Sequence, residues 1–343
     1  MHLIRKYQRL NDPTDIVEQE IIDIIDSGEY PVIQYCEPVY NSQLLKQVDD
    51  LCLKYGAKLE VRFYGHYSGA FDATWLSYIP NVVNLSIDCL SEIENIEHLY
   101  HLKNVEVLSF GVFEFADKDF LSQLQLVGLQ ELRISDNRKK NFDLKALENA
   151  TSLRELSVVG HIKNIESIKS ISSLKLLKLS QINRKVSLEF LNETLALEEL
   201  EILLGGRDDI DELSIPTLKT LRILRVRGLE KLPSFAKFPN LECLHIEDQT
   251  KLEFIDLSEA SLKSLIIGNC KHLSNVSNLT SQNELFRLSV SRTKLDLDAL
   301  KQNDWPSSLK VISLWSGSNK WNDSTKQFFQ DKGYVTYPWQ LET

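Results

Sequence analysis

The sequence predicts an α/β solenoid, with a parallel β-sheet on its concave side and short helices or irregular segments on its convex side. First, the apolar pattern of TSLRELSVVG, at residues 151–160, recurs every 20–24 residues along most of the chain. Second, its spacing of three and then two fits neither a helical stripe nor simple alternation, so it indicates a chain that enters a strand. Third, the 343 residues are 43% hydrophobic and 26% charged, which is typical of a soluble protein with a large core.

The repeated pattern has the form L-x-x-L-x-L, and all three of its fixed positions are large and apolar in every repeat. The first position is occupied by Val82, Val105, Leu129, Leu153, Leu174, Leu197, Leu221, Leu241, Leu262, Leu285 and Leu309. The fourth is occupied by Leu85, Leu108, Leu132, Leu156, Leu177, Leu200, Leu224, Leu244, Leu265, Leu288 and Ile312. The sixth is occupied by Ile87, Phe110, Ile134, Val158, Leu179, Ile202, Val226, Ile246, Ile267, Val290 and Leu314. Because alternate side chains of a strand point to opposite faces, the fourth and sixth positions point inward and the third, fifth and seventh outward. One such unit cannot bury its apolar face alone, so neighbouring units are expected to stack.

Over residues 58–317 these repeats resemble the leucine-rich repeat family, and their short period resembles its bacterial members. The resemblance implies a horseshoe-shaped solenoid. Many members carry Asn at the ninth position, but here only Asn137 matches. The other residues of that column are Leu90, Phe113, His161, Ile182, Gly205, Leu229, Gln249, Cys270, Thr293 and Gly317. The loops after the strands are therefore expected to vary in path.

Residues 1–57 are predicted to form an N-terminal cap that is continuous with the solenoid. Asp12-Pro13 favours a helix start, and an apolar stripe then runs to Gly28. PVIQYC, at 31–36, is typical of a strand, NSQLLKQVDDLCLKYG, at 41–56, of a capped helix, and KLEVRFYG, at 58–65, of a second strand. This strand–helix–strand unit is expected to join the main sheet.

The return segments are predicted to be mixed. Residues 143–147 and 188–191 favour short helices, and irregular or extended structure is expected after about residue 205, where the two prolines of segment 229–239 exclude a regular helix. Residues 318–343 are predicted to form a C-terminal cap, with a helix near 322–332 and an edge strand in YVTYPW that Pro338 ends. We expect Trp305, Trp315, Trp321 and Trp339 to cover the last coil.

The outward strand positions are the predicted binding surface, because leucine-rich repeat proteins usually bind there. The candidate residues of the middle coils carry both signs of charge and suit a protein partner of complementary charge. They are Arg133, Glu155, Lys178, Glu199, Glu201, Arg225, Arg227, His245 and Glu247. A solvated face without a partner is the alternative. Tyr64 and His66, expected to point outward from the strand at 58–65, are a second candidate surface, although packing of the cap against the first regular coil is favoured for them.

Catalysis has weak support in the sequence. Cys243 and His245 could resemble a cysteine–histidine pair of a hydrolase or transferase, but residues two apart on a strand lie roughly 7 Å apart and no orienting third group follows. His98 and His101 share a helical face without a third metal ligand. We therefore expect no enzyme activity, no cofactor and no metal site.

Charge and cysteine content limit the partners and the compartment. The net charge of −10 argues against a nucleic-acid partner, and no apolar run is long enough for a membrane helix. Five scattered cysteines favour a reducing, cytoplasmic location. The sequence thus predicts a non-catalytic protein-binding module. The resemblance implies a role as adaptor, regulator or toxin-neutralising protein, and a self-associating structural protein is a further alternative.

Overall fold

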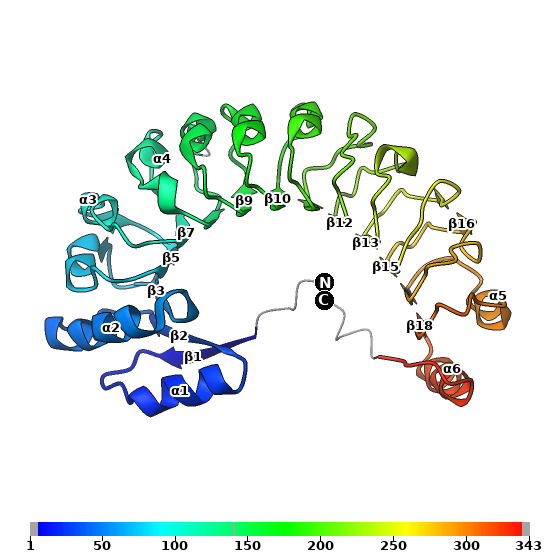
Figure 1. The fold of residues 1–343 in the computed structure, drawn as a ribbon, viewed down its shortest axis with the longest axis horizontal. Helices are drawn as coiled ribbons and strands as arrows, with labels where there is room; N and C mark the ends of the chain where they lie inside the picture. The colour runs from blue at the N-terminus through cyan, green and yellow to red at the C-terminus, as the bar shows by residue number, and fades with distance from the viewer. Residues whose placement is uncertain (1–5, 140, 338–343) are drawn as a thin grey trace. The chain divides into compact units, whose positions relative to one another are not determined.

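The computed structural model describes residues 6–139 and 141–337 and consists of two compact units, Met1–Leu174 and Lys175–Thr343. Within each unit the chain winds in successive coils. Each regular coil contributes a strand to a parallel sheet and then returns through a helix, a 3-10 turn or an extended segment on the other side of that sheet (Figure 1). We call the side of the sheet without return segments the open face.

In the first unit, neighbouring strands of the sheet follow the order β1-β2-β3-β5-β7-β8-β9 among the described residues. Their bounds are β1 Tyr7–Asn11, β2 Tyr30–Tyr35, β3 Glu60–Gly65, β5 Asn84–Leu90, β7 Val107–Val112, β8 Glu131–Ile134 and β9 Glu155–Val159. The return segments are α1 Glu18–Asp26, α2 Ser42–Tyr55, η1 Gly56–Lys58, η2 Ala73–Tyr78, α3 Glu97–Tyr100, α4 Phe120–Gln123, η3 Leu126–Gly128, η4 Leu144–Asn149 and η5 Ile165–Ser170. The short strands β4 Phe71–Asp72 and β6 Ile93–Glu94 pair with each other.

In the second unit, the strand order over the described residues is β10-β11-β12-β13-β15-β17-β18. These strands are β10 Leu176–Ser180, β11 Glu199–Leu203, β12 Thr220–Leu224, β13 Cys243–Glu247, β15 Ser264–Gly268, β17 Arg287–Ser291 and β18 Val311–Trp315. The return side holds η6 Glu189–Glu193, η7 Phe235–Lys237, α5 Leu297–Gln302, α6 Asn319–Asp331 and the paired strands β14 Phe254–Asp256 and β16 Asn275–Ser277. After residue 205 the return side is irregular or extended as far as β16, as expected, apart from the 3-10 turn η7, and α5 is a second exception.

The cap elements show where local signals were correct and where they misled. Strand β2 and helix α2 lie as predicted, with Asn41 accepting hydrogen bonds from two backbone N–H groups at the N-terminus of α2. The prediction of a helix from Asp12-Pro13 is wrong, because Asp12 has φ +46° and accepts from the Cys36 backbone N–H in a turn. Helix α1 begins at Glu18, and the preceding strand β1, which was not predicted, pairs in parallel with β2.

At the C-terminus, α6 lies close to the predicted helix, and Gly333 beyond it has φ +85°. Val335 forms an isolated parallel bridge with Val311 at the sheet edge. Trp305, Trp315 and Trp321 are half-buried, and Trp321 in α6 donates a hydrogen bond to Asp298 in α5 at 2.9 Å. Pro338 and Trp339, named in the sequence predictions, lie outside the described residues.

The core of each unit follows the predicted columns. Strand pairing aligns the fourth positions of neighbouring coils, for example Leu108 with Leu132 and Leu244 with Leu265. In every coil except the one at residue 221, the residues assigned to the fourth and sixth positions are buried. Of the residues assigned to the first position, only Val105 is half-buried and the others are buried. Burying a side chain of this size contributes about 1.5–3 kcal/mol, so these columns are a main source of stability.

One coil has a different register from the predicted one. Leu221, assigned to the first position, pairs with Leu200 and Leu244 and therefore occupies the fourth position. Leu224, predicted to point into the core, is only half-buried at the seventh position. The physical reason is that the pattern fits twice, since Leu218, Leu221 and Ile223 match it as well as residues 221–226 do. The structure selects the first match, which buries all three of those residues.

The ninth position binds the backbone between coils more often than Asn137 alone predicts. Asn137 donates to the Phe115 carbonyl at 3.0 Å. His161 donates through Nε2 to the Ser135 carbonyl at 3.1 Å, and Gln249 donates to the Ile223 carbonyl at 3.0 Å. These three side chains are buried, so each replaces water at a carbonyl of the preceding coil.

The second position of the coils forms a ladder of alternating charge in the second unit. Its residues, from coil to coil, are Lys175, Glu198, Lys219, Glu242 and Lys263. Glu198 contacts the ammonium groups of Lys219 at 2.8 Å and Lys175 at 3.1 Å, and Lys263 lies 2.7 Å from Glu242. Hydrogen bonds from Lys219 and then Lys175 lower the pKa of the Glu198 carboxyl. We call these five residues the charge ladder.

Candidate functional site

The open face of the first unit is polar, but its charges are mostly paired and recessed. Arg62 of β3 lies 2.7 Å from Asp88, and its guanidinium is 4.6 Å from the ring centroid of Tyr64. The Tyr64 hydroxyl accepts a hydrogen bond from Gln34, a buried residue of β2. Tyr64 thus points outward from β3 as predicted, within a network that already occupies its hydroxyl. The Arg62 and Asp88 side chains are each only 20% exposed, which leaves little charge for a partner to contact.

Further along this face, Arg133 pairs with Glu131 of its own strand at 2.8 Å. Glu155 is half-buried on the neighbouring strand β9, where its backbone aligns with Glu131. The structure therefore places Arg133 and Glu155 on the open face as predicted. Whether they bind a partner stays a prediction.

His66 does not belong to the open face, so its predicted outward orientation is wrong. The strand ends at Gly65, and His66 takes a left-handed conformation with φ +50° that turns its side chain inward. The whole residue is 4% exposed, with Nε2 3.0 Å from the Tyr40 hydroxyl and Nδ1 2.9 Å from the Tyr64 carbonyl. Burial lowers the pKa of His66, which favours the neutral ring. This histidine packs the first coils together.

The open face of the second unit carries more accessible charge. Lys178, Glu201 and Arg222 occupy aligned positions on β10, β11 and β12. Arg222 lies 2.9 Å from Glu199, and Lys178 lies 4.0 Å from Glu201. The Lys178 side chain is 47% exposed, so its ammonium group is open to a partner. We call these four residues the charged strip. Three of them were predicted from the sequence, and Arg222 was missed because of the register error.

The same register error misplaces Arg225 and Arg227, which were predicted to project from a strand. Arg225 occupies the eighth position, where the chain leaves β12 with φ +55°. Its Nε lies 3.0 Å from Asp248, and its side chain is 60% exposed. Arg227 follows two residues later, outside the strand. Arg225 therefore borders the open face at its edge, whereas Arg227 is not an outward strand residue.

Beside Arg225 the open face has a hollow of about 210 Å³. It lies across β13, β15 and β17 and is lined by Arg225, His245, Glu247, Asp248, Ile266, Gly268, Asn269, Ser289, Ser291 and Arg292. Four of these residues, at 225, 248, 269 and 292, hold the eighth position of neighbouring coils, and each has φ near +50°. The repeated left-handed turn thus places two arginines, an aspartate and an asparagine along one edge of the hollow. We call this feature the edge hollow.

The interactions of Cys243 and His245 do not favour a catalytic pair. His245 Nε2 lies 3.2 Å from a carboxylate oxygen of Glu247, which would orient the ring, but among the described residues no hydrogen bond joins His245 to Cys243. Burial raises the pKa of the Cys243 thiol, whereas a nucleophilic cysteine requires a lowered pKa. The prediction that His245 and Glu247 point to the open face agrees with their position in the edge hollow.

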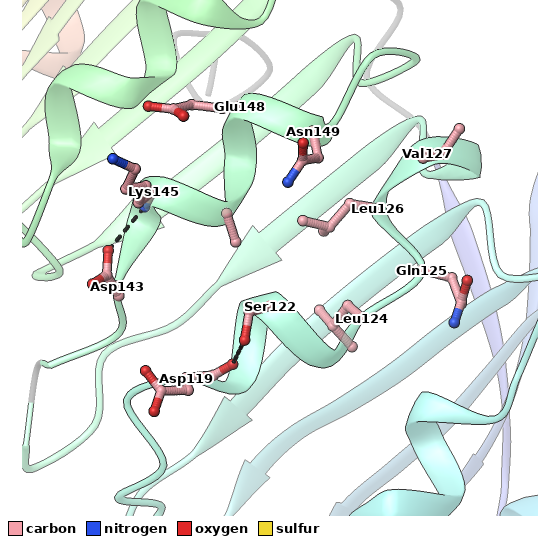
Figure 2. Close-up of a pocket in the computed structure, with 11 residues that line it drawn as sticks. Asp119, Ser122, Leu124, Gln125, Leu126, Val127, Asp143, Lys145, Glu148 and Asn149 are labelled. Atoms are coloured by element: carbon pink, nitrogen blue, oxygen red, sulfur yellow. Dashed lines mark hydrogen bonds between the residues drawn. The ribbon is translucent and has the colours of Figure 1, made fainter.

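A second hollow, of about 420 Å³, lies on the return side of the first unit, between α4, η3 and η4 (Figure 2). Its charged side chains include Asp119, Asp143, Lys145 and Glu148. Asp143 accepts from the Lys145 backbone N–H at 3.0 Å (Figure 2) and pairs with Lys163 at 2.7 Å. Its bond to Lys163, with help from Asn164 and Lys145, lowers the pKa of Asp143 to about 2. A carboxylate held in this way stabilises η4 and is a poor proton donor or acceptor near pH 7.

His98 lies in α3, and His101 follows at the C-terminus of that helix. His98 and His101 lie with their ring centroids 6.3 Å apart. Within residues 6–139 and 141–337, no group of three His, Cys, Asp or Glu side chains is arranged to hold a metal ion. Over the same residues, no helix has the length and apolar character needed to cross a membrane.

Comparisons with known proteins identify similar folds. No protein-family model matches the chain, and no curated protein matches it in sequence. Among solved structures, an internalin from Listeria monocytogenes is similar over 92% of this chain and 87% of its own, with 17% identity and a TM-score of 0.52. The fold is a leucine-rich repeat solenoid.

Two further solved structures match less closely. Toll, in its Drosophila complex with Spätzle, matches over 90% of this chain and 51% of its own, with 17% identity and a TM-score of 0.44. A second internalin from Listeria monocytogenes matches over 71% of this chain and 83% of its own, with 21% identity and a TM-score of 0.33. At these identities the similarity is one of fold.

Several residues of the leucine-rich repeat open face escaped the sequence analysis. Asp248, Asn269 and Arg292 precede the loops, at a position that the strand alternation does not cover. The signal that could have found them is the recurrence of Gly, Asn, Asp and Arg two residues after the sixth position, since Gly, Asn and Asp favour the left-handed conformation.

Proposed function

We propose that this chain is a non-catalytic module that binds a protein partner on the open face of its second unit. The observation that carries the proposal is the charged strip, in which side chains of both signs lie on adjacent, rigid strands. Such a surface suits a partner with complementary charges, and electrostatic complementarity favours fast and selective association. The leucine-rich repeat fold supports the proposal, because stacked coils present an extended surface.

The second unit is favoured over the first because of the exposure of its charges. Lys178 and Arg225 expose 47% and 60% of their side chains, whereas on the first unit Arg62 and Asp88 expose 20% each and Arg133 exposes 39%. A partner would thus gain new ion pairs on the second unit at a smaller cost of breaking existing ones.

We propose a non-catalytic function because Cys243 and His245, the best candidates for a catalytic pair, lack the properties of a nucleophile and its base. Burial raises the pKa of the Cys243 thiol, and among the described residues no hydrogen bond joins this thiol to His245. Neither group is prepared for nucleophilic attack.

The test is affinity capture from the native cell with tagged wild-type chain and two charge-reversal variants. The first variant, Lys178→Glu with Arg222→Glu, changes the charged strip. The control, Lys185→Glu with Lys271→Glu, makes the same change of charge at exposed residues outside the strands. We expect the control to recover the wild-type partner and the strip variant to lose most of it. Equal recovery by all three proteins would refute binding at the strip.

We also propose a cytoplasmic location. Its support is that the cysteines Cys36, Cys52, Cys89, Cys243 and Cys270 are all free thiols. Free thiols persist in a reducing compartment. Fractionation of the native cell, followed by detection of the chain with an antibody, tests this location, and recovery outside the cytoplasm would overturn it.

A further inference from the structure

The edge hollow has the size of a site for one side chain. Its volume is about 210 Å³, whereas pockets for drug-sized molecules measure about 300–1,000 Å³. A single long side chain of a docked protein is therefore a better match for it than a cofactor.

Gly268 lies at the base of the hollow and deepens it, because glycine has no side chain. A Cβ atom at this residue would lie 3.3 Å from Cγ of Glu247 and 3.7 Å from Oγ of Ser291. The missing side chain thus leaves space between β13 and β17, and backbone strain plays no part, because Gly268 is not in the left-handed region. A larger residue here would fill the space from below.

The charged side chains that line the hollow differ in how freely a partner could contact them. Both Asp248 oxygens are occupied, one by Arg225 Nε and the other by the Asn269 side-chain amide. The Glu247 carboxylate contacts Nε2 of His245. These two carboxylates are also recessed, with 21% and 26% of their side chains exposed.

Arg225 and Arg292 are the exposed cations of the lining, and Arg225 is the one that lies against Asp248. Its side chain is 60% exposed, and its Nε bond to Asp248 holds the guanidinium at the rim. A guanidinium has five N–H donors, so the terminal Nη groups keep donors for a further acceptor. No residue within the described parts of the chain accepts a hydrogen bond from those Nη groups. A planar pair of N–H donors matches a carboxylate, which can accept two parallel bonds.

From this arrangement we propose that the edge hollow binds the carboxylate side chain of an aspartate or glutamate of the partner protein, with Arg225 as the main donor. The inference rests on the proposed function, because it identifies the chemistry that the partner brings to this face. The acidic side chain enters between Arg225 and Gly268, and its carboxylate lies against the Nη groups.

The experiment uses a small probe and so needs no known partner. Glutamate capped as an N-acetyl methylamide, which carries only its side-chain carboxylate, is titrated into the full-length, ¹⁵N-labelled chain. We expect shifts of backbone amide signals confined to the segments that line the hollow, which are residue 225 and residues 245–248, 266–269 and 289–292. Capped glutamine and capped lysine should cause no such shifts. Equal shifts with glutamine, stronger shifts with lysine, or no localised shift with glutamate would each overturn the proposal.

Three variants separate the site from general effects. Gly268→Val fills the floor and should abolish the localised shifts. Ser264→Val makes a similar change on the same strand and face but outside the hollow, and should leave them intact. Arg225→Lys keeps the charge but removes the guanidinium fork and with it one charge-assisted hydrogen bond, so affinity for the capped glutamate should fall about tenfold. Binding that survives Gly268→Val would place the carboxylate elsewhere and contradict the proposal.

The two proposals fail in different ways. If capped glutamate does not bind the hollow while the strip variant still loses the partner, the carboxylate inference is wrong and the proposed function stands. If capped glutamate binds but the strip variant and wild type recover the same partner, binding at the strip is refuted while the hollow remains a carboxylate site.

Discussion

Gly228→Ala is expected to destabilise the second unit because two coils meet there backbone to backbone. A Cβ atom at residue 228 would lie 2.6 Å from the Gly206 carbonyl oxygen and 2.7 Å from that of Arg207. At least one coil would have to recede by about 0.4 Å to bring the closer contact to 3.0 Å, at the limit of real Cβ contacts. Overpacking costs about 1–3 kcal/mol, and we expect a loss near 3 kcal/mol because both obstructing atoms belong to the backbone.

Urea unfolding followed by circular dichroism measures this loss, with the slope m compared between proteins to verify that the unfolded states are equivalent. The matched control is Gly317→Ala in the same unit, where an added Cβ would meet no atom within 4 Å. Its backbone is not left-handed, so the control should be neutral or more stable by about 0.4–1 kcal/mol. If Gly228→Ala had the same unfolding free energy as the control, close backbone contact between these coils would be disproved.

Three further outcomes follow from the described contacts. Asp143→Asn should lower stability at pH 7, because the lowered pKa of the Asp143 carboxyl means that its ionised form stabilises the fold. The difference from wild type should vanish as the pH falls from about 4 through about 2, where the carboxyl becomes protonated. Urea unfolding at several pH values measures this difference. Iodoacetamide at pH 7.5 should modify the exposed Cys89 well before Cys243, whose pKa is raised by burial, and faster labelling of Cys243 in mass spectra would revive the nucleophile hypothesis. Arg207→Met should cost about 2–4 kcal/mol, because it leaves Glu212 and a backbone carbonyl without the buried guanidinium that binds both; an unfolding free energy equal to that of wild type would contradict this role.

Periodic burial made most of the fold predictable. The spacing of Leu153, Leu156 and Val158 indicates which side chains are buried, and the same spacing in the other coils indicates how their strands align. It failed at Leu221 because two overlapping matches were equally apolar, and only the pairing with neighbouring strands distinguishes them. Strand β1 was missed because YQRLN has too little apolar character to predict it without its partner β2.

The candidate site was less predictable than the fold. Alternation along a strand places Lys178 and Glu201 on the open face, because that face depends only on the period of two. The edge hollow depends instead on backbone turns at Arg225 and Asp248, and on a missing side chain at Gly268. His66 failed for a related reason, since its left-handed turn reverses the orientation that a continued strand would give.

The charge ladder limits how the second unit could have changed in length during evolution. Solenoids grow and shrink by duplication or excision of whole coils. Removing the coil that bears Glu198 would bring Lys175 beside Lys219, and removing the one that bears Lys219 would bring two carboxylates together. Loss or gain of two adjacent coils keeps opposite charges as neighbours. Homologues of different length are therefore expected to differ in this region by an even number of coils.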